Sequence, residues 1–417
     1  MNSQIAADSP RTPWICCQVG AREHYAIPRA LAAAGHEVKL LTDVWASPSA
    51  NLWMPERWKQ RKHPEISSDR VVSWNLDALR IRAYASVRRL SFWERVLLED
   101  QWFQRRAAKW LHRHVPHMVQ PPVVFAYSYA AREIFETAKE LGCMTVLGQI
   151  DPGPVEMRLV QSLETKYGFT DCEWPHESYW NGWRQECRLA DRVVVNSDWS
   201  REALIKEGMN SALIDVIPLA YEKPGDTSQS QVKTPSDFSR TRPLRVLFLG
   251  QINLRKGIKE LAEAIKLLYS EPVEWTFVGS GNAQLVSELQ TLPQAVVVGA
   301  IARNDVARFY QKADIFILPT HSDGFAITQL EAASYGLPVI ASPYCGKVVI
   351  DGKNGLLLPE VSEVAIAAAV KRLLEKPEIL TEMRSAQEKV SRLSIRQLGE
   401  RLTSLNTTQQ PKAPNHA

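Results

Sequence analysis

Short apolar runs alternate with segments of helical periodicity along most of the chain. The first three segments are WICCQVG at 14–20, IPRALAAAG at 27–35 and HEVKLLTD at 36–43. Apolar runs of this length are typical of strands that are buried on both faces, and amphipathic segments between them are typical of parallel βαβ units. The pattern therefore predicts an α/β fold.

One segment interrupts the alternation. Residues 223–242 are rich in Pro, Ser, Thr, Gln and Lys and contain few large apolar residues, a composition typical of linkers. Directly after this segment a second series of strand-like runs begins with LRVLFLG and continues to NGLLLP. We expect two Rossmann-like, doubly wound domains, 12–222 and 243–403, which face each other across a cleft.

Composition agrees with a soluble protein of two domains. The chain has 417 residues, 45% of them hydrophobic and 23% charged, and its net charge of +4 is too small to indicate nucleic-acid binding. It contains neither an apolar run long enough to span a membrane nor the layout of a signal peptide. No two of its six cysteines have C-x-x-C spacing, so we expect reduced thiols in a cytoplasmic protein.

The segment LPTHSDGFAITQLEAASYGLPVIAS, at 318–342, carries candidate chemistry. Asp323, Gly324 and Phe325 are predicted to form the turn between a strand and a helix, and Glu331 to lie about two turns into that helix. Amides at a helix start can bind an anion, and a carboxylate can accept two hydrogen bonds from a ribose diol. The alternative interpretation is a structural turn followed by a solvated acidic residue.

Two other predicted strand ends in the same half carry compatible residues. Gly250 ends one strand and is followed by Arg255 and Lys256 at the start of an amphipathic helix, where two cations suit a diphosphate. Gly279 and Gly281 follow the next strand and would allow close approach of a ligand to the backbone. Because carboxyl ends of parallel strands share one sheet edge, these residues predict a site for a ribose, a diphosphate and a sugar.

The C-terminal half resembles the retaining nucleotide-sugar glycosyltransferases of family 4, which have the two-domain GT-B fold. The family signature is a Glu, seven residues and a second Glu; this chain has DGFAITQLE, so Asp323 replaces the first Glu and Ala326 the second Gly of the motif. The resemblance extends to GQINLRKG, FVGSG, ADIFILPT and VIDGKNGLLLP, and in the N-terminal half to VNSDWSREALIKEG.

The resemblance implies a role for each matching residue. Glu331 would hold the ribose, Asp323 would contact the donor sugar, and Arg255 and Lys256 would neutralise the diphosphate. The residues implied in donor binding are Gly20, Gly250, Arg255, Lys256, Gly279, Gly281, Gly324, Phe325, Ala326 and Glu331.

The N-terminal half departs from the family pattern. Many members carry a His-Asp pair after a strand, but Gln149 stands here at the position of the His, while Asp151 is kept. We therefore predict Asp151 and Asp323 as the catalytic residues, with the alternative that Asp151 only shapes a turn. Gln149 and Glu156, together with Arg22 and His24 near the first strand end, are candidates on the acceptor side.

The activity that the resemblance implies is transfer of a hexose from a UDP- or GDP-sugar to a hydroxyl acceptor, with retention, in glycan or polysaccharide biosynthesis. We expect neither a metal nor a cofactor, because Arg255 and Lys256 supply positive charge and the sequence has no cluster with ligand spacing. Two alternatives remain open: a nucleotide-sugar-binding protein without catalysis, and a sugar-nucleotide epimerase on the same fold.

The acceptor is expected to be a glycan or a lipid-linked molecule. Residues 80–114 interleave basic and aromatic side chains, a pattern that suits peripheral contact with the inner face of a membrane or, alternatively, a helix pair packed on its own domain. Trp174, Trp180 and Trp183 could stack on sugar rings of an acceptor or belong to the core. No nucleic-acid module is recognisable, so no nucleic-acid partner is expected.

Overall fold

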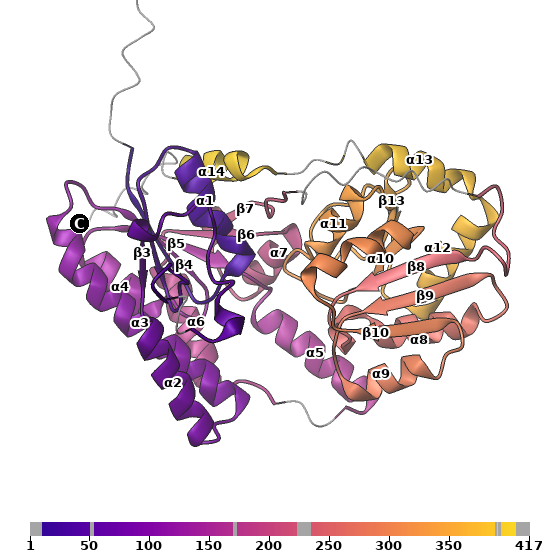
Figure 1. Ribbon diagram of the computed structural model, residues 1–417, viewed down its shortest axis with the longest axis horizontal. Coiled ribbons are helices and arrows are strands. Elements are labelled where there is room, and N and C mark those ends of the chain that lie inside the picture. The colour runs from indigo at the N-terminus through magenta and orange to yellow at the C-terminus, as the bar shows by residue number, and fades with distance from the viewer. Residues whose placement is uncertain are drawn as a thin grey trace, which may run out of the picture.

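The computed structural model describes residues 11–50, 54–169, 173–222, 235–387, 390 and 393–405. Most of the linker predicted at 223–242 lies outside the described residues. On both sides of this gap the chain forms an α/β unit with its own parallel sheet (Figure 1).

The N-terminal half contains a sheet of seven parallel strands, in the order β3-β2-β1-β4-β5-β6-β7, within the described residues. The strands are β1 (Trp14–Gln18), β2 (Val38–Thr42), β3 (Val71–Ser73), β4 (Val123–Tyr127), β5 (Met144–Gln149), β6 (Arg192–Val195) and β7 (Ile214–Val216). The helices are α1 (Ala26–Ala33), α2 (Asn75–Val87), α3 (Phe92–His114), α4 (Arg132–Glu140), α5 (Pro154–Tyr167), α6 (Glu177–Leu189) and α7 (Asp198–Lys206).

The C-terminal half contains a second parallel sheet, whose described strands have the order β10-β9-β8-β11-β12-β13. The strands are β8 (Leu244–Leu249), β9 (Val273–Val278), β10 (Ala295–Gly299), β11 (Ile315–Leu318), β12 (Val339–Ala341) and β13 (Gly355–Leu357). The helices are α8 (Ile258–Leu267), α9 (Ala283–Gln290), α10 (Ala307–Lys312), α11 (Thr328–Ser334), α12 (Glu363–Glu375), α13 (Glu378–Ala386) and α14 (Ile395–Ser404).

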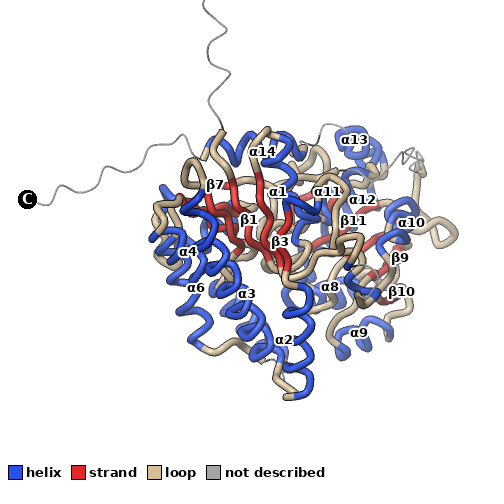
Figure 2. The backbone as a smooth tube through the Cα atoms, turned by 60° about the vertical axis from the view of Figure 1, so that its left-hand side comes forward, coloured by secondary structure: helices blue, strands red, loops and turns tan. Residues whose placement is uncertain are grey.

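Helices cover both faces of the N-terminal sheet (Figure 2). Successive residues of β1 point to opposite faces: Ile15 and Cys17 pack into the core that α3, α4 and α6 cover, and Trp14 and Cys16 into the core that α1 and α14 cover. All five residues of β1 are buried, as expected for a central parallel strand. The predicted pair of doubly wound domains is confirmed.

Two helices join the halves by packing across the boundary that the sequence suggests. α5 follows β5 of the N-terminal sheet, yet its Leu163 belongs to the core of the C-terminal half, and the Tyr167 hydroxyl donates to Glu260 Oε1 at 2.6 Å. α5 therefore bridges the cleft, as Figure 1 shows.

α14 crosses in the other direction. A Cβ atom on its Gly399 would lie 2.0 Å from the Ala30 carbonyl oxygen of α1, so the two helices are in backbone contact. His36 Nε2 and Thr403 Oγ1 are 2.8 Å apart beside them. The last helix of the predicted domain 243–403 therefore packs with the N-terminal half. Its apolar side chains share one hydrophobic core with those of α1.

No helix in the described part of the chain is both long and apolar enough to cross a membrane. The described cysteines, Cys16, Cys17, Cys143, Cys187 and Cys345, are free and buried.

Candidate functional site

The neighbouring strands β8 and β9 end side by side, and three glycines predicted to bind the donor follow them: Gly250, Gly279 and Gly281. A Cβ atom on Gly279 would lie 1.9 Å from the Gly250 carbonyl oxygen, and one on Gly281 would lie 2.0 Å from the Ile252 carbonyl oxygen. Both distances are impossible for real atoms, so these positions require glycine for the contact between two backbones. This requirement exists without a ligand, and the predicted contact of these glycines with a donor stays a prediction.

Lys256 and Asp323 form an ion pair at the same edge of the sheet. Lys256 ends the short helix η7 (Leu254–Lys256), which the Asn253 side chain caps by accepting from the Lys256 amide. The Lys256 side chain is 10% exposed. Burial alone would raise the pKa of Asp323, but the cations of Lys256 and Arg255 outweigh burial and hold this pKa below its ordinary value. Asp323 is therefore ionised, and an incoming anion must compete with it for Lys256.

Arg255 lies at the junction of the two halves. Its Nη1 donates to the Ser322 carbonyl oxygen at 2.9 Å and lies 3.4 Å from Glu156 Oε2 of α5 and 3.6 Å from Asp323 Oδ2. The guanidinium thus connects the candidate donor edge with the N-terminal half. Lys256 pairs more closely with Asp323 than Arg255 does, and the predicted contact of both cations with a diphosphate stays a prediction.

Glu156 completes this junction. Its Oε2 accepts a 2.6 Å hydrogen bond from the Ser322 hydroxyl, which itself accepts from Trp199 Nε1 at 2.9 Å. Burial raises the pKa of Glu156 to about 7, although the nearby Arg255 acts in the opposite direction. The carboxyl group that holds the halves together can therefore change its charge near neutral pH.

Glu331 lies in the first turn of α11, not two turns into the helix as predicted. The reason is that the helix begins only at Thr328, after an irregular loop over Asp323 and its successors. The Tyr310 hydroxyl donates to Glu331 Oε2 at 2.8 Å and so fixes the carboxylate at the helix start. Tyr310 was not predicted, since it comes from the preceding helix α10.

The loop before α11 holds three predicted donor-binding residues in different surroundings. A Cβ atom on Gly324 would lie 2.2 Å from the Ile150 carbonyl oxygen, so Gly324 contacts the N-terminal half directly. The Phe325 ring is buried, and its amide donates to Asp323 Oδ1 at 3.1 Å. Ala326 has a φ of 62°, a left-handed conformation that a side chain disfavours.

Asp151 is held in place after β5 by three donors. Its Oδ1 accepts from the Gly153 amide at 2.8 Å, from Gln149 Nε2 at 3.2 Å and from the Tyr129 hydroxyl. Gln149 is 1% exposed and also accepts from Trp183 Nε1, so it positions Asp151 and does not face the cleft. Asp151 therefore shapes a turn, as the alternative interpretation expected, and it also lines a cavity, while its catalytic role stays a prediction.

Tyr129 is itself in a strained backbone conformation, with a φ of 77°. The buried carboxylate of Glu186 stabilises this turn by accepting from the amides of Tyr129 at 2.7 Å, Ala131 at 2.8 Å and Arg132 at 3.3 Å. Burial raises the pKa of Glu186 to about 7, although these amides act to lower it. Sequence reasoning missed Tyr129, although its place just after β4 follows the strand-end rule.

The turn after β1 carries Gly20, Arg22 and His24. The Gly20 amide donates to Asp43 Oδ1 at 2.8 Å, so it is engaged within the protein. Glu23, His24 and Tyr25 all have positive φ, between 49° and 60°. This turn brings the His24 ring into contact with Arg303 of the C-terminal half, and it places Arg22 over the Tyr127 ring.

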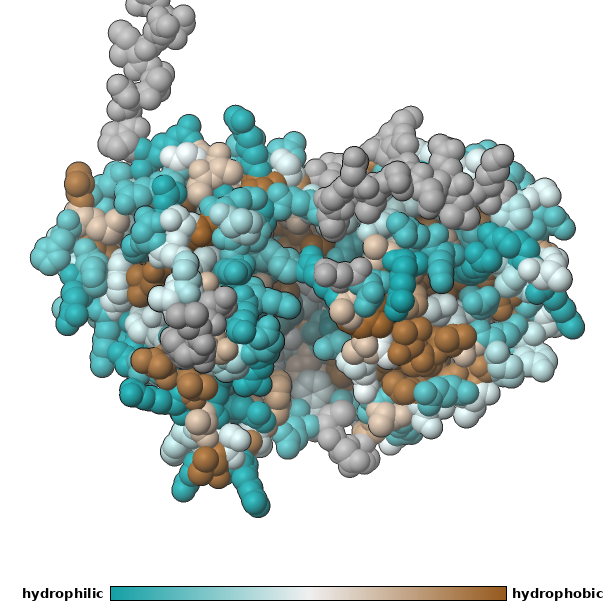
Figure 3. Space-filling model, in the orientation of Figure 1, coloured by the Kyte–Doolittle hydropathy of each residue, from teal (hydrophilic) through white to brown (hydrophobic). Residues whose placement is uncertain are grey.

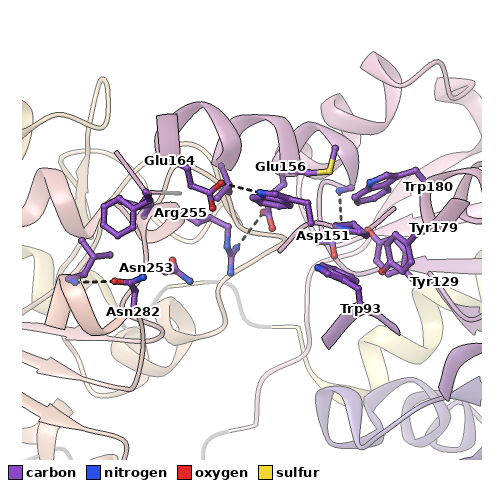
Figure 4. Close-up of a pocket in the computed structure, with 18 residues that line it drawn as sticks. Trp93, Tyr129, Asp151, Glu156, Glu164, Tyr179, Trp180, Asn253, Arg255 and Asn282 are labelled. Carbon is purple, nitrogen blue, oxygen red and sulfur yellow. Dashed lines mark hydrogen bonds and ion pairs between the residues drawn. The ribbon is translucent and has the colours of Figure 1, made fainter. Parts of the chain in front are cut away.

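A cavity of about 290 Å³ lies between the halves, next to Arg255 (Figure 4). Asp151 and Glu156 line it, together with side chains of η7 and α9 from the C-terminal half. Its aromatic lining comes from Trp93, Tyr129, Phe169, Trp174, Tyr179 and Trp180. The space-filling view shows the groove that separates the two halves (Figure 3).

The structure distinguishes among the tryptophans of 174–183. Trp180 and Trp183 are both buried in the core of the N-terminal half, and of the three tryptophans Trp174 and Trp180 line the cavity. Residues 80–114 form parts of α2 and α3, whose Phe103 and Leu111 pack on the sheet while Phe92 stays exposed. In the described part of the chain, no three His, Cys, Asp or Glu side chains gather in a group that could hold a metal ion.

The chain has curated relatives that it matches over part of their length. It is 28% identical over 199 residues to a putative teichuronic acid biosynthesis glycosyltransferase of Bacillus subtilis, covering 46% of this chain and 49% of the relative. It is 29% identical over 236 residues to D-inositol 3-phosphate glycosyltransferase of Kineococcus radiotolerans, covering 48% and 53%. The chain thus spans about half the length of these relatives.

Solved structures share the fold over nearly the whole chain. Anabaena HepE in complex with UDP and glucose aligns with a TM-score of 0.61 at 16% identity, covering 96% of this chain and 100% of that one. Sucrose-phosphate synthase from Thermosynechococcus elongatus aligns with a TM-score of 0.62 at 20% identity, covering 95% and 98%. At these identities the likeness shows the GT-B fold.

Two family models account for most of the chain between them. The model for glycosyltransferase family 4 matches residues 25–222, and the model for glycosyl transferases group 1 matches residues 243–376. The first match begins after β1 and ends with the N-terminal half, the second begins with β8, and the predicted linker lies between the two matches. The chain therefore belongs to the family 4 glycosyltransferases of the group 1 type, which have the GT-B fold.

Proposed function

We propose that the protein transfers a hexose from a nucleotide sugar to a hydroxyl acceptor, with retention of the anomeric configuration, in glycan or polysaccharide biosynthesis. The observation that carries this proposal is the arrangement at one sheet edge of Lys256, Asp323 and Glu331. Lys256 offers a positive charge to a diphosphate, and Glu331, fixed by Tyr310, offers a carboxylate to a ribose.

The positive charge of Lys256 and Arg255 also suits the chemistry of the step. The acceptor oxygen forms a bond to the anomeric carbon while the bond from that carbon to the diphosphate breaks. The acceptor proton passes to the departing diphosphate oxygen, and both electrons of the broken bond stay with the diphosphate. Preorganised cations stabilise the negative charge that develops there, so the step as proposed needs neither a metal nor a cofactor.

Asp151 and Asp323 are proposed to be the catalytic residues, and Asp323 is proposed to contact the donor sugar. Three donors hold Oδ1 of Asp151, while its Oδ2 has no hydrogen-bond donor among the described residues. A carboxylate so placed can orient the acceptor hydroxyl and stabilise positive charge on the sugar ring. The donor is proposed to be a UDP- or GDP-sugar; the HepE structure, which was solved with UDP and glucose, supports the first.

Peripheral contact with a membrane is part of the proposal for a lipid-linked acceptor. The exposed side chains of Tyr84, Val87 and Phe92 lie near the junction of α2 and α3, where Arg88 and Arg89 are also exposed. Apolar and basic groups on one exposed turn suit the surface of an anionic membrane.

Calorimetric titration with UDP, GDP, uridine and guanosine tests the donor site. We expect Glu331→Ala to weaken the nucleoside and the nucleoside diphosphate by a similar factor, and Lys256→Ala to weaken only the diphosphate, about ten-fold or more. The exposed Glu360→Ala serves as control. Equal losses of nucleoside and diphosphate in Lys256→Ala would contradict the diphosphate role.

Turnover separates a transferase from a binding protein. Release of nucleoside diphosphate that requires an acceptor supports the transferase. Binding of nucleotide sugars without turnover across a broad panel of acceptors would favour a binding protein without catalysis.

A further inference from the structure

The strand β10 forms one edge of the C-terminal sheet, and in the described part of the chain it pairs only with β9. The Gln294 carbonyl oxygen accepts from the Trp275 amide of β9 at 2.8 Å. Because the backbone groups of successive residues point to opposite sides of a strand, Val296 also faces β9 and Val297 faces the open side. Apart from the ladder with β9, the described residues give Val297 no hydrogen-bond partner. Its N–H and C=O are therefore open to a further strand.

The opposite edge of the same sheet is closed by its own loop. The Gly352 amide donates to the Gly355 carbonyl oxygen of β13 at 2.9 Å, and the Leu357 amide donates to Asp351 Oδ1 at 2.9 Å. The loop before β13 thus satisfies backbone groups that would otherwise be open to another strand. Natural proteins commonly protect an edge strand in such a way. The contrast makes β10 the edge of this sheet at which a partner strand can pair.

Apolar side chains are exposed on one face of this edge. Val296 is 53% and Val298 is 37% exposed, whereas Val278 of the neighbouring β9 is buried in a core with Tyr310 of α10. In the space-filling view a hydrophobic patch of the C-terminal half lies over β9 and β10 (Figure 3). Residues 289–302 include no charged residue that would repel another strand. An apolar patch beside an open edge is typical of an interaction surface.

The edge is complementary to a second copy of itself. If two β10 strands run antiparallel with Val297 opposite Val297 of the second copy, each N–H meets the C=O of the other. This register also places Val296 opposite Val298 of the second copy, which forms two apolar cross-strand pairs, and the small Ala295 opposite Gly299. The register with β9 is regular up to Val297 and shifts between Val297 and Gly299, so the central hydrogen bonds fall on regular backbone.

We propose that the protein forms a twofold dimer in which the β10 edges of two copies pair antiparallel. The two six-stranded sheets then become one continuous sheet across the dimer. A second copy is the occupant because one exposed strand supplies both the open backbone groups and the apolar side chains that cover them. The inference goes beyond the proposed function and does not depend on it.

The test is sedimentation velocity of the full chain over a range of concentrations, from about 1 μM to about 100 μM. We expect a shift from the monomer to a species of twice its mass as the concentration rises. Val297→Pro removes the open N–H but leaves the ladder with β9, since proline is tolerated where the N–H faces away from the neighbouring strand. This variant should weaken the dimer more than ten-fold, because one hydrogen bond is lost from each copy.

A second variant acts on a side chain in place of the backbone. Val296→Lys puts a charge on the exposed face of β10, where it would lie against Val298 of the second copy, and should also weaken the dimer more than ten-fold. Val364→Lys, at a valine of α12 that is 64% exposed, is the matched control and should leave the dimer unchanged. Urea unfolding of each variant shows whether the chain is still folded.

Three outcomes would overturn the inference. A monomer at every concentration would leave the edge to a strand of some other protein. A dimer that survives both Val297→Pro and Val296→Lys would have its interface elsewhere. An equal loss in Val364→Lys would make the added charge, and not its position on β10, the cause. Because the measurement contains neither nucleotide nor acceptor, its result is independent of the tests of the proposed function.

Discussion

The two halves form tight turns at their strand ends in different ways. In the C-terminal half, Gly279 and Gly281 allow one backbone to contact another directly. In the N-terminal half, the residues with positive φ after β1 and β4 include Glu23, His24 and Tyr129, which carry large side chains. A left-handed residue with a side chain costs about 1 kcal/mol or more, and such strain concentrates where side chains are needed.

This difference matches what each half offers to a ligand. The C-terminal half presents a few charged groups on a rim whose shape is set by the backbone. The N-terminal half presents side chains that the strained turns orient: Tyr129 reaches Asp151, and His24 reaches the opposite half. Under the proposed function, the C-terminal half recognises a donor group that needs few side chains, and the N-terminal half recognises a particular acceptor, which needs specific ones.

The largest effect is expected at the backbone contact of the C-terminal half. Gly279→Ala should lower the free energy of unfolding by about 3 kcal/mol or more, because the new Cβ would lie 1.9 Å from the Gly250 carbonyl oxygen. Gly336→Ala is the matched control: its φ is 74° but no atom lies within 4 Å, so we expect a loss of about 1 kcal/mol. Urea unfolding measures both, and equal losses would refute the steric argument.

A smaller effect is expected at the junction of the halves, where Glu156 has a pKa raised to about 7 against an ordinary value of 4.5. Between these two pH values the unfolded chain has released the Glu156 proton while the folded protein keeps it, so stability falls as pH rises. We expect wild type to lose of the order of 2 kcal/mol more than Glu156→Gln from pH 4.5 to pH 8. Parallel slopes of unfolding free energy against pH for the two proteins would contradict this assignment.

The strained turn of the N-terminal half should matter for turnover more than for stability. Tyr129→Phe keeps the ring but removes the hydrogen bond to Asp151, and should lower kcat about ten-fold, the equivalent of a charge-assisted hydrogen bond of about 1.5 kcal/mol. KM for the donor should stay unchanged, since Tyr129 lies away from the proposed donor edge. Tyr84→Phe, at an exposed position on α2, is the control. A change in KM alone would argue against a positioning role.

The smallest effect concerns Ala326, the one described residue of the C-terminal half that is left-handed without being glycine. Ala326→Gly should raise the free energy of unfolding by about 0.5 kcal/mol, because relief of strain exceeds the added flexibility of the unfolded chain. His24→Gly in the N-terminal half relieves similar strain but also removes the contact with Arg303, so its gain should be smaller. A larger gain at His24 than at Ala326 would contradict the view that side-chain contacts offset the strain there.

Much of the fold was predictable because the signals are local. Alternation of apolar runs and amphipathic helices predicted both doubly wound sheets, and the DGFAITQLE motif located Asp323 and Glu331 at a strand end. The start of α11 was predicted too early, since the irregular loop before Thr328 depends on the contact of Gly324 with the other half. Tyr310, Ser322 and Tyr129 were missed because their partners are distant in the sequence.

The sequence by itself determined the two parallel sheets, the polar segment between them and the residues that end each strand, because periodicity and turn chemistry act over a few residues. Only the tertiary structure decided that α14 returns to α1, that α5 bridges the halves, and that Glu156, Arg255 and Ser322 meet at the junction. It also decided that Trp174 and Trp180 line a cavity and that Trp183 does not. These outcomes depend on packing between segments far apart in the chain, which no local pattern of residues encodes.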